Sequence, residues 1–258
     1  MKIISDVLLD KFRQKIQFSP LEAMNDLAEE EIALDYFEFY NSVSAVYSSR
    51  IEGENIELDS YVKHKFQNIE FLPDVTRRVD DLFNAYLLIK EQSLSAANFF
   101  QAHRILSANL LPPHQKGHVR TTAMMVINEK GHIEYVAPTQ FEVNNELQKL
   151  FSDIDFLLQQ ELDEIEVFYY ASYIHFVFAK IHPMSDGNGR SARLLEKWFL
   201  YEKFGENAFA IALEKNYYHN ISEYYLNLKK TGLEYGETDW SQAFDFLLMT
   251  VNSLQRKI

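Results

Sequence analysis

One short segment in the second half of the sequence combines side chains that could carry out group transfer on a phosphate. It runs His182-Pro183-Met184-Ser185-Asp186-Gly187-Asn188-Gly189-Arg190-Ser191-Ala192-Arg193. A histidine can accept a proton near neutral pH, and an aspartate is a hard oxygen ligand suited to the Mg²⁺ that accompanies a polyphosphate. Arg190 and Arg193 are three positions apart, so they share one face of a helix's first turn and can both hold phosphate oxygens.

The local sequence also predicts the shape of this segment. Pro183 disfavours helical dihedral angles at His182, so the histidine is expected where a helix ends. Gly187 and Gly189 allow conformations and close approaches that a Cβ would block. A glycine-bearing loop that leads into a helix presents unpaired backbone N–H groups, and these favour an anion. The pattern GxxxxGK(S/T) is absent, so this is not a P-loop.

Each part of the segment has a structural interpretation when it is taken alone. A histidine at a helix end is usually structural, Asp-Gly-Asn-Gly is a common turn, and two arginines at this spacing usually form a solvated face. The combination instead predicts a phosphoryl- or nucleotidyl-transfer site.

Helical periodicity predicts the elements that position this loop. Apolar residues recur at helical spacing over residues 27–48, 79–90, 95–110, 141–160, 164–180, 190–203, 221–230 and 239–255. Gly205 suits the end of the helix that follows the loop. One segment differs: two β-prone runs within 120–136 flank the polar turn Asn128-Glu129-Lys130-Gly131, which predicts a hairpin. A hairpin alone in a helical protein is usually a flap or an interaction edge, although it can also be a simple connector.

Composition narrows the classes of partner. The chain has 258 residues, 47 % of them hydrophobic, and a formal net charge of −13, which disfavours a nucleic-acid partner. There is no cysteine, so neither a disulfide nor a thiolate metal site can form. No signal-peptide pattern follows Met1, and the apolar run 165–181 is too short and too interrupted by Glu166, His175 and Lys180 to span a membrane. We therefore expect a cytoplasmic protein with no membrane partner.

The segment His182–Arg193 resembles the motif of the Fic family, usually written HPFx(D/E)GNGRxxR. Every polar position matches, and Met184 replaces the usual phenylalanine at a position thought to face the core. Methionine fills such a space adaptably, so we expect altered packing and intact chemistry. The resemblance covers residues 40–248 and is strongest at the motif.

This resemblance implies AMP transfer from ATP to a protein hydroxyl. His182 would remove the proton of a serine, threonine or tyrosine hydroxyl, and that oxygen would attack the α-phosphorus as pyrophosphate leaves. Asp186 would hold Mg²⁺, and the backbone of Gly187, Asn188 and Gly189 would bind phosphate oxygens with help from the Asn188 side chain. Arg190 and Arg193 would neutralise the outer phosphates. Positioning and charge stabilisation carry such reactions.

Further matches lie outside the motif. The hairpin strand Met125-Val126-Ile127, preceded by Gly117-His118-Val119-Arg120, lies where the family has a flap that aligns the target by strand addition. Tyr224 and Tyr225 fall where members often have a tyrosine pair near the adenine, and ordinary core packing is an equal alternative for them.

Ser48-Ser49-Arg50-Ile51-Glu52-Gly53 resembles the family's inhibitory motif, Ser/Thr-x-x-x-Glu-Gly/Asn. Ser48 and Glu52 are one helical turn apart, and Gly53 suits the helix end. In the family this glutamate pairs with the second motif arginine, here Arg193, and blocks productive placement of the γ-phosphate. The alternative is an ordinary helix end with an exposed glutamate.

The sequence therefore predicts a mainly α fold: a Fic-type helical core with one β-hairpin flap and an N-terminal helical extension. Residues 1–60 would form an N-terminal helical region with the inhibitory helix, and 61–258 the catalytic core. The implied activity is AMPylation with Mg²⁺ and ATP, inhibited by Glu52. The alternatives are removal of AMP and a silent nucleotide-binding regulatory module. Self-modification and homodimer formation are common in such proteins.

Overall fold

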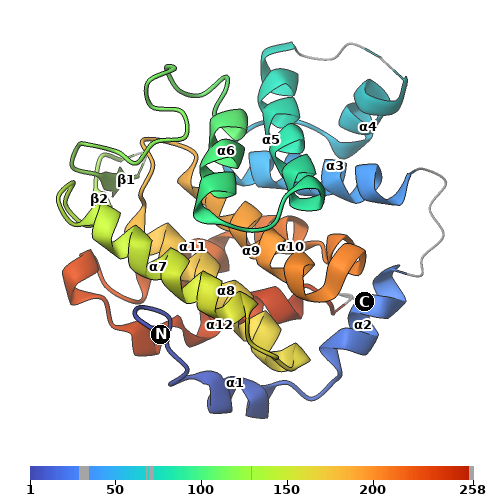
Figure 1. Cartoon of the computed structure of the whole chain (residues 1–258). Helices are drawn as coiled ribbons and strands as arrows, with labels where there is room; N and C mark the ends of the chain where they lie inside the picture. The colour runs from blue at the N-terminus through green and yellow to red at the C-terminus, as the bar shows by residue number, and fades with distance from the viewer. Residues whose placement is uncertain (29–34, 68, 70–72, 129, 256–258) are drawn as a thin grey trace.

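The computed structural model describes residues 1–28, 35–67, 69, 73–128 and 130–255. Helices dominate this part of the chain, and one short hairpin accompanies them (Figure 1), so the predicted mainly α fold is confirmed. The elements run α1 (Leu9–Lys15), α2 (Pro20–Ala28), α3 (Tyr36–Ile51), α4 (Leu58–Gln67), α5 (Pro73–Glu91), α6 (Ala96–Leu106), β1 (Met125–Ile127), β2 (Ile133–Val136), α7 (Val143–Leu158), α8 (Glu164–Ile181), α9 (Asn188–Phe204), α10 (Leu213–His219), α11 (Ile221–Lys229) and α12 (Phe244–Asn252), with 3₁₀ turns at Gly205–Ala210, Tyr235–Glu237 and Trp240–Ala243.

Helix α8 is the central element. It begins at a capping box in which Asp163 and Glu166 each accept the other's backbone N–H, at 2.9 Å in both directions. Most of its residues are buried, and it packs against α9, α12 and α7. A helix that is apolar on all sides is stabilised by burial in a core. Within the described residues, no helix combines the length and apolar character that crossing a membrane requires.

Several helix boundaries differ from the periodicity. The single helix expected over 27–48 is divided: Leu27 belongs to α2, and α3 begins at Tyr36 because the Asp35 carboxylate caps it by accepting from the Glu38 backbone N–H. Ile32, which contributed to that expectation, lies outside the described residues. Helix α6 ends at Leu106, well before the predicted 110. The segment predicted as a helix over 239–255 begins with a 3₁₀ turn before α12.

The predicted hairpin is present. Strands β1 and β2 pair antiparallel, with Met125 opposite Val136 and a bulge between Val126 and Ile127. Residue 129 of the predicted turn lies outside the described residues. The hairpin is attached to the helical body through β2, because Val136 N–H donates to the Leu233 carbonyl at 2.8 Å. Figure 1 shows the hairpin at one edge of the molecule, with α3, α4 and α5 grouped on another side.

Candidate active site

The loop between α8 and α9 has an unusual backbone. His182 ends α8 in the left-handed region, with φ 50° and ψ 56°, and is the one non-glycine residue with positive φ in the described part of the chain. Gly187 has φ 76° and precedes α9, where a residue with a Cβ would be strained. Strained non-glycine conformations persist where surrounding contacts hold them, and they are concentrated at functional sites.

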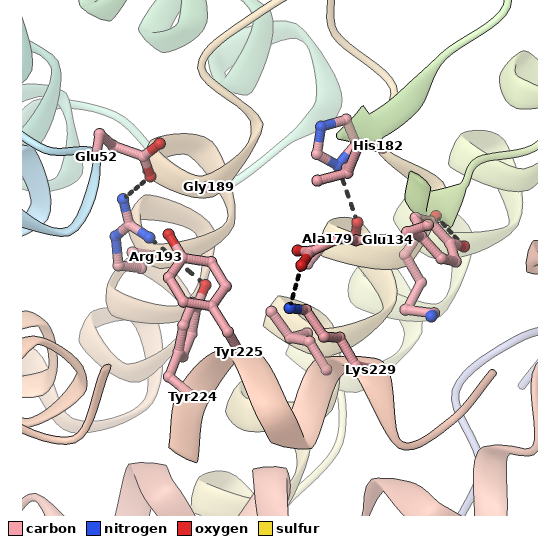
Figure 2. A pocket seen from close by; sticks show the side chains of 13 residues that line it. Glu52, Glu134, Ala179, His182, Gly189, Arg193, Tyr224, Tyr225 and Lys229 are labelled. Carbon is pink, nitrogen blue, oxygen red and sulfur yellow. Dashed lines mark hydrogen bonds and ion pairs between the residues drawn. The ribbon is translucent and has the colours of Figure 1, made fainter. Parts of the chain in front are cut away.

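The ring of His182 is oriented for proton acceptance. Its Nδ1 lies 3.2 Å from the Ala179 carbonyl oxygen (Figure 2). Since a carbonyl can only accept, Nδ1 carries the hydrogen, and Nε2 of the neutral ring remains a free acceptor. Burial lowers the pKa of His182, so the neutral form dominates at physiological pH.

Arg120 fixes the backbone of the same loop, a role that the sequence did not indicate. Its guanidinium is buried and donates to three carbonyl oxygens: His182 at 2.8 Å, Thr122 at 2.7 Å and Pro138 at 2.6 Å. Its backbone N–H also donates to the Pro183 carbonyl at 2.9 Å. Arg120 therefore connects the segments that flank the hairpin to His182, the residue that would accept the proton.

His103 on α6 fixes the other end of the loop, and it too was missed. Its Nδ1 accepts from the Gly117 backbone N–H at 2.9 Å, so Nε2 must carry the hydrogen and donate to the Asp186 carbonyl at 3.1 Å. The buried ring has a lowered pKa because of desolvation, which keeps it neutral in this arrangement. No local motif marks His103, which lies far from the loop in sequence.

Asn188 and Met184 give the loop its internal shape. The Asn188 amide accepts from Met184 N–H at 2.8 Å and donates to the Met184 carbonyl at 2.9 Å. Both polar atoms of that side chain are thus used inside the loop, and the backbone of the glycine-rich turn is the part available to an anion. The Met184 side chain is fully buried.

Asp186 is the residue at this turn whose carboxylate could coordinate a metal ion. One carboxylate oxygen accepts from Gly187 N–H at 2.6 Å, and the side chain borders a surface pocket that Arg190 also lines. Mg²⁺ commonly takes one or two carboxylates together with waters and substrate phosphates, so the residue fits such an ion. Within the described residues, no three His, Asp or Glu side chains are grouped to hold a metal.

Arg193 is fully buried and held by the end of α3. Its Nε donates to Ser48 Oγ at 2.8 Å, and Nη2 donates to the Ser48 carbonyl at 3.1 Å and to Glu52 Oε1 at 2.6 Å. Burial lowers the pKa of Arg193, but Glu52 outweighs it and the net shift is upward. Burial likewise raises the pKa of Glu52, but Arg193 and Arg190 outweigh it and hold that pKa below its usual range. The pair is therefore ionised.

Arg190 turns toward a different carboxylate. Its Nη2 donates to Glu54 Oε1 at 3.0 Å, and the same oxygen lies 2.9 Å from Nε of Arg78 on α5. The two motif arginines are thus paired with Glu52 and Glu54, on either side of Gly53, whose φ is 86°.

A cavity of about 280 Å³ brings part of the predicted site together, including His182, Gly189 and Arg193 (Figure 2). The side chain of Tyr224 is buried and donates to the buried His175 at 3.1 Å, whereas Tyr225 is 39 % exposed and donates to the Ile51 carbonyl at 3.3 Å. Val126 of β1 faces this cavity, and its strand neighbours Met125 and Ile127 are exposed. The cavity is lined by Glu52, Val126, Glu134, Tyr135, Ala179, Lys180, His182, Gly189, Arg193, Tyr224, Tyr225, Leu228 and Lys229.

Three charged residues that were not predicted from the sequence line the same cavity on the side away from Arg193: Glu134, Lys180 and Lys229. Glu134 of β2 pairs with Lys229 of α11 at 2.7 Å and so links the hairpin to that helix across the cavity (Figure 2). Lys180 lies over the Tyr135 ring at 3.7 Å, and burial lowers its pKa to about 8.

Comparisons with known proteins agree with this fold and motif. Residues 93–200 match the Fic/DOC family. The chain is 32 % identical over 113 residues to "Protein adenylyltransferase fic-1" of Caenorhabditis briggsae, covering 43 % of this chain and 20 % of that protein. It is 27 % identical over 112 residues to "Protein adenylyltransferase Fic" of Nematostella vectensis, covering 43 % of this chain and 24 % of that protein.

Solved structures extend the similarity over almost the whole chain. A Fic family protein from Desulfovibrio desulfuricans superposes with a TM-score of 0.74 at 18 % identity, covering 98 % of this chain and 73 % of that one. Fic-1 of Caenorhabditis elegans (residues 134–508) gives 0.67 at 16 % identity, covering 96 % and 70 %. At these identities the structures show a shared fold.

The helical fold, the loop and the family match define a Fic-type protein. The match to the Fic/DOC family spans residues 93–200, which include α6 to α8 and most of α9. It spans about a fifth of the length of the curated relatives given above.

Proposed function

We propose that this chain transfers AMP from ATP to a serine, threonine or tyrosine hydroxyl of a protein, either a separate target or the chain itself. The observation that carries the proposal is that one cavity is lined by the free acceptor of His182 and by the anion-binding elements Gly189 and Arg193. A base and an anion site around one cavity are what nucleotidyl transfer to a hydroxyl requires.

In the proposed reaction, Nε2 of His182 takes the hydroxyl proton as the oxygen attacks the α-phosphorus. A new O–P bond forms, the bond from the α-phosphorus to the bridging oxygen breaks, and pyrophosphate leaves. Backbone N–H groups of Asn188 and Gly189 bind phosphate oxygens at the start of α9, where the helix dipole favours negative charge, and the Gly187 N–H joins them once it releases the Asp186 carboxylate. Mg²⁺, held by Asp186 and the phosphates, would offset the charge of those oxygens when bound.

The hairpin would place the hydroxyl. Within the described chain β1 pairs only with β2, so its outer edge is open to an added strand. Val126 faces the cavity from that strand, and an extended target segment beside it would run along the cavity mouth. Residues 61–258 would form the catalytic core in this proposal, and residues 1–60 would carry the inhibitory helix.

The same proposal assigns an inhibitory role to Glu52. Its carboxylate takes the guanidinium that would otherwise hold a terminal phosphate, at 2.6 Å, and Ser48 holds the same arginine. Keeping a site ~99 % closed needs about 2.7 kcal/mol. Hydrogen bonds to charged groups contribute about 1.5–3 kcal/mol, which is the same scale.

The test is the intact mass after incubation with Mg·ATP. We expect Glu52→Gly to gain one AMP, while the wild type gains far less and Glu52→Gly/His182→Ala gains none. Lysate incubated with labelled ATP extends the test to separate targets. If Glu52→Gly labels neither itself nor a lysate protein above the double variant, the proposed transfer is wrong.

A second candidate is removal of AMP from a modified protein. It is favoured by one observation: the ionised Glu52 carboxylate lines the same cavity as His182 and could activate a water there. Loss of AMP from a labelled protein that requires both Glu52 and His182 would support it. A catalytically silent regulatory module would instead bind Mg·ATP and perform neither reaction.

A further inference from the structure

The side chain of Glu54 is buried, although the neighbouring residues Gly53 and Asn55 are exposed. It lies just after the end of α3, where Gly53 and Asn55 face solvent, yet its side chain is only 7 % exposed. One oxygen, Oε1, lies 2.9 Å from Arg78 Nε and 3.0 Å from Arg190 Nη2. The turn thus directs a carboxylate between two guanidinium groups that come from α5 and α9.

This cluster leaves buried polar atoms without hydrogen-bond partners. Oε2 of Glu54 accepts nothing and Nε of Arg190 donates to nothing. Nε of Arg78 also makes no hydrogen bond, so its contact with Glu54 is an ion pair without hydrogen-bond geometry. An unmade hydrogen bond on a buried charged group costs more than one on a neutral group. Two guanidinium forks offer more donors than one carboxylate oxygen uses, and they match the several oxygens of a phosphate better.

The cluster also borders the site. Glu54, Arg78 and Arg190 line a surface pocket with Asp186, the proposed ligand of Mg²⁺. Glu52 lines both this pocket and the main cavity, so the two are adjacent. An anion bound by Arg78 and Arg190 would therefore lie beside the phosphates of a nucleotide in the main cavity.

We propose that Arg78 joins Arg190 in binding the pyrophosphate part of the nucleotide, and that the Glu54 carboxylate fills the space between the two arginines in the present structure. This inference rests on the proposed function for the identity of its ligand. Glu52 and Glu54 then act together from one turn, each covering one arginine of α9. Movement of that turn about Gly53 exposes Arg193, Arg190 and Arg78 at once.

Arg78 is singled out by comparison with its neighbour. Arg77 lies on the same helix but is 67 % exposed and pairs with Asp74 at 3.8 Å, away from both pockets. The Arg78 side chain is 37 % exposed and turned toward the site. Replacing either arginine by methionine removes the same charge, so Arg77→Met controls for the change in net charge.

The experiment is calorimetric titration with inorganic pyrophosphate, and with AMP as the reference ligand. We expect Glu54→Gln to bind pyrophosphate about tenfold more tightly than the wild type, the scale of one charge-assisted hydrogen bond. Adding Arg78→Met should remove that gain, and adding Arg77→Met should keep it. The exposed Glu57→Gln controls for loss of an acid, and AMP affinity should be equal in all variants.

Two results would overturn the inference: Glu54→Gln binding pyrophosphate no better than the wild type, or Arg78→Met matching Arg77→Met. Thermal melting of each variant establishes that it is folded. If Glu54→Gln does not fold, Arg78→Met and Arg77→Met are compared for ATP affinity in the Glu52→Gly background. Equal ATP affinities of these two variants would then overturn the inference. If pyrophosphate binds as expected but no AMP is transferred, only the proposed function is rejected. If AMP is transferred at the same rate with and without Arg78→Met, only this inference is rejected.

Discussion

Gly189 and the Glu52 carboxylate occupy adjoining space so closely that no side chain fits between them. A Cβ built on Gly189 would collide with Oε1 of Glu52 and lie 3.1 Å from Nη1 of Arg193. The glycine therefore permits the contact between the α3 terminus and Arg193. The same absence of a side chain would let a phosphate approach the backbone once Glu52 withdraws.

The first prediction concerns this close approach. In the Glu52→Gly background, Gly189→Ala should lower AMP transfer and ATP affinity by at least about tenfold, because the methyl group fills space that a phosphate oxygen needs. Rates by intact mass and affinities by calorimetry measure this. Gly236→Ala is the control, since a Cβ there meets nothing within 4 Å. Equal ATP affinity with and without the Gly189 substitution would place the phosphates elsewhere.

The candidate site was predictable where its residues are consecutive. His182 and Arg193 were predicted together because they lie in one short segment, the loop after α8 and the first turns of α9. Local rules for proline, glycine and helix starts describe that segment. Arg120 and His103 were missed because they reach the loop from distant parts of the chain. Their roles depend on tertiary packing, which cannot be predicted from residue types and local spacing.

The second prediction concerns pH. His182 must be neutral to accept a proton, and burial lowers its pKa, so transfer by Glu52→Gly should fall only at pH values below the ordinary 6.5. Because Glu52 raises the pKa of His182, removing that carboxylate moves the midpoint lower still. The measurement is kcat/KM against pH from about 5 to about 8. ATP affinity over the same range separates binding from proton transfer, and a midpoint at or above 6.5 would contradict the assignment.

The fold was predictable from periodicity, and the ends of its elements were less so. The residues around α8 and α9 are apolar at regular spacing, so both helices were expected. The division between α2 and α3 had a local signal in Asp35 followed by Glu38, a capping pattern that an apolar count over 27–48 ignores. Short α10 carries too few turns for periodicity to distinguish it from a connection.

The third prediction tests His103 as a positioning residue. His103→Phe keeps an aromatic ring but removes both nitrogens, leaving the Gly117 N–H and the Asp186 carbonyl without their partner. The free energy of unfolding should fall by about 1–3 kcal/mol. In the Glu52→Gly background, kcat should fall more than ATP affinity, because the loop that carries Asp186 is displaced. The exposed His114→Phe should change neither quantity, and a stability loss with unchanged kcat would make His103 purely structural.

The last prediction separates the two tyrosines of α11. Tyr224 is buried within a chain of hydrogen bonds: Arg193 donates to its hydroxyl at 3.5 Å, the hydroxyl donates to His175 Nε2, and His175 Nδ1 donates to the buried Glu196 at 2.6 Å. Tyr224→Phe breaks that chain in the core. The free energy of unfolding by denaturant should therefore fall by about 1–3 kcal/mol.

Tyr225 instead contacts the end of α3, next to the proposed inhibitory residue Glu52. Its hydroxyl donates to the carbonyl of Ile51, the residue before Glu52, and the ring is partly exposed. Tyr225→Phe should change stability by less than about 0.5 kcal/mol. It should also loosen the end of α3 and raise AMP transfer by the otherwise wild-type chain about twofold, with no effect once Glu52 is glycine. If Tyr225→Phe raises transfer equally in both backgrounds, the contact with Ile51 does not act through Glu52.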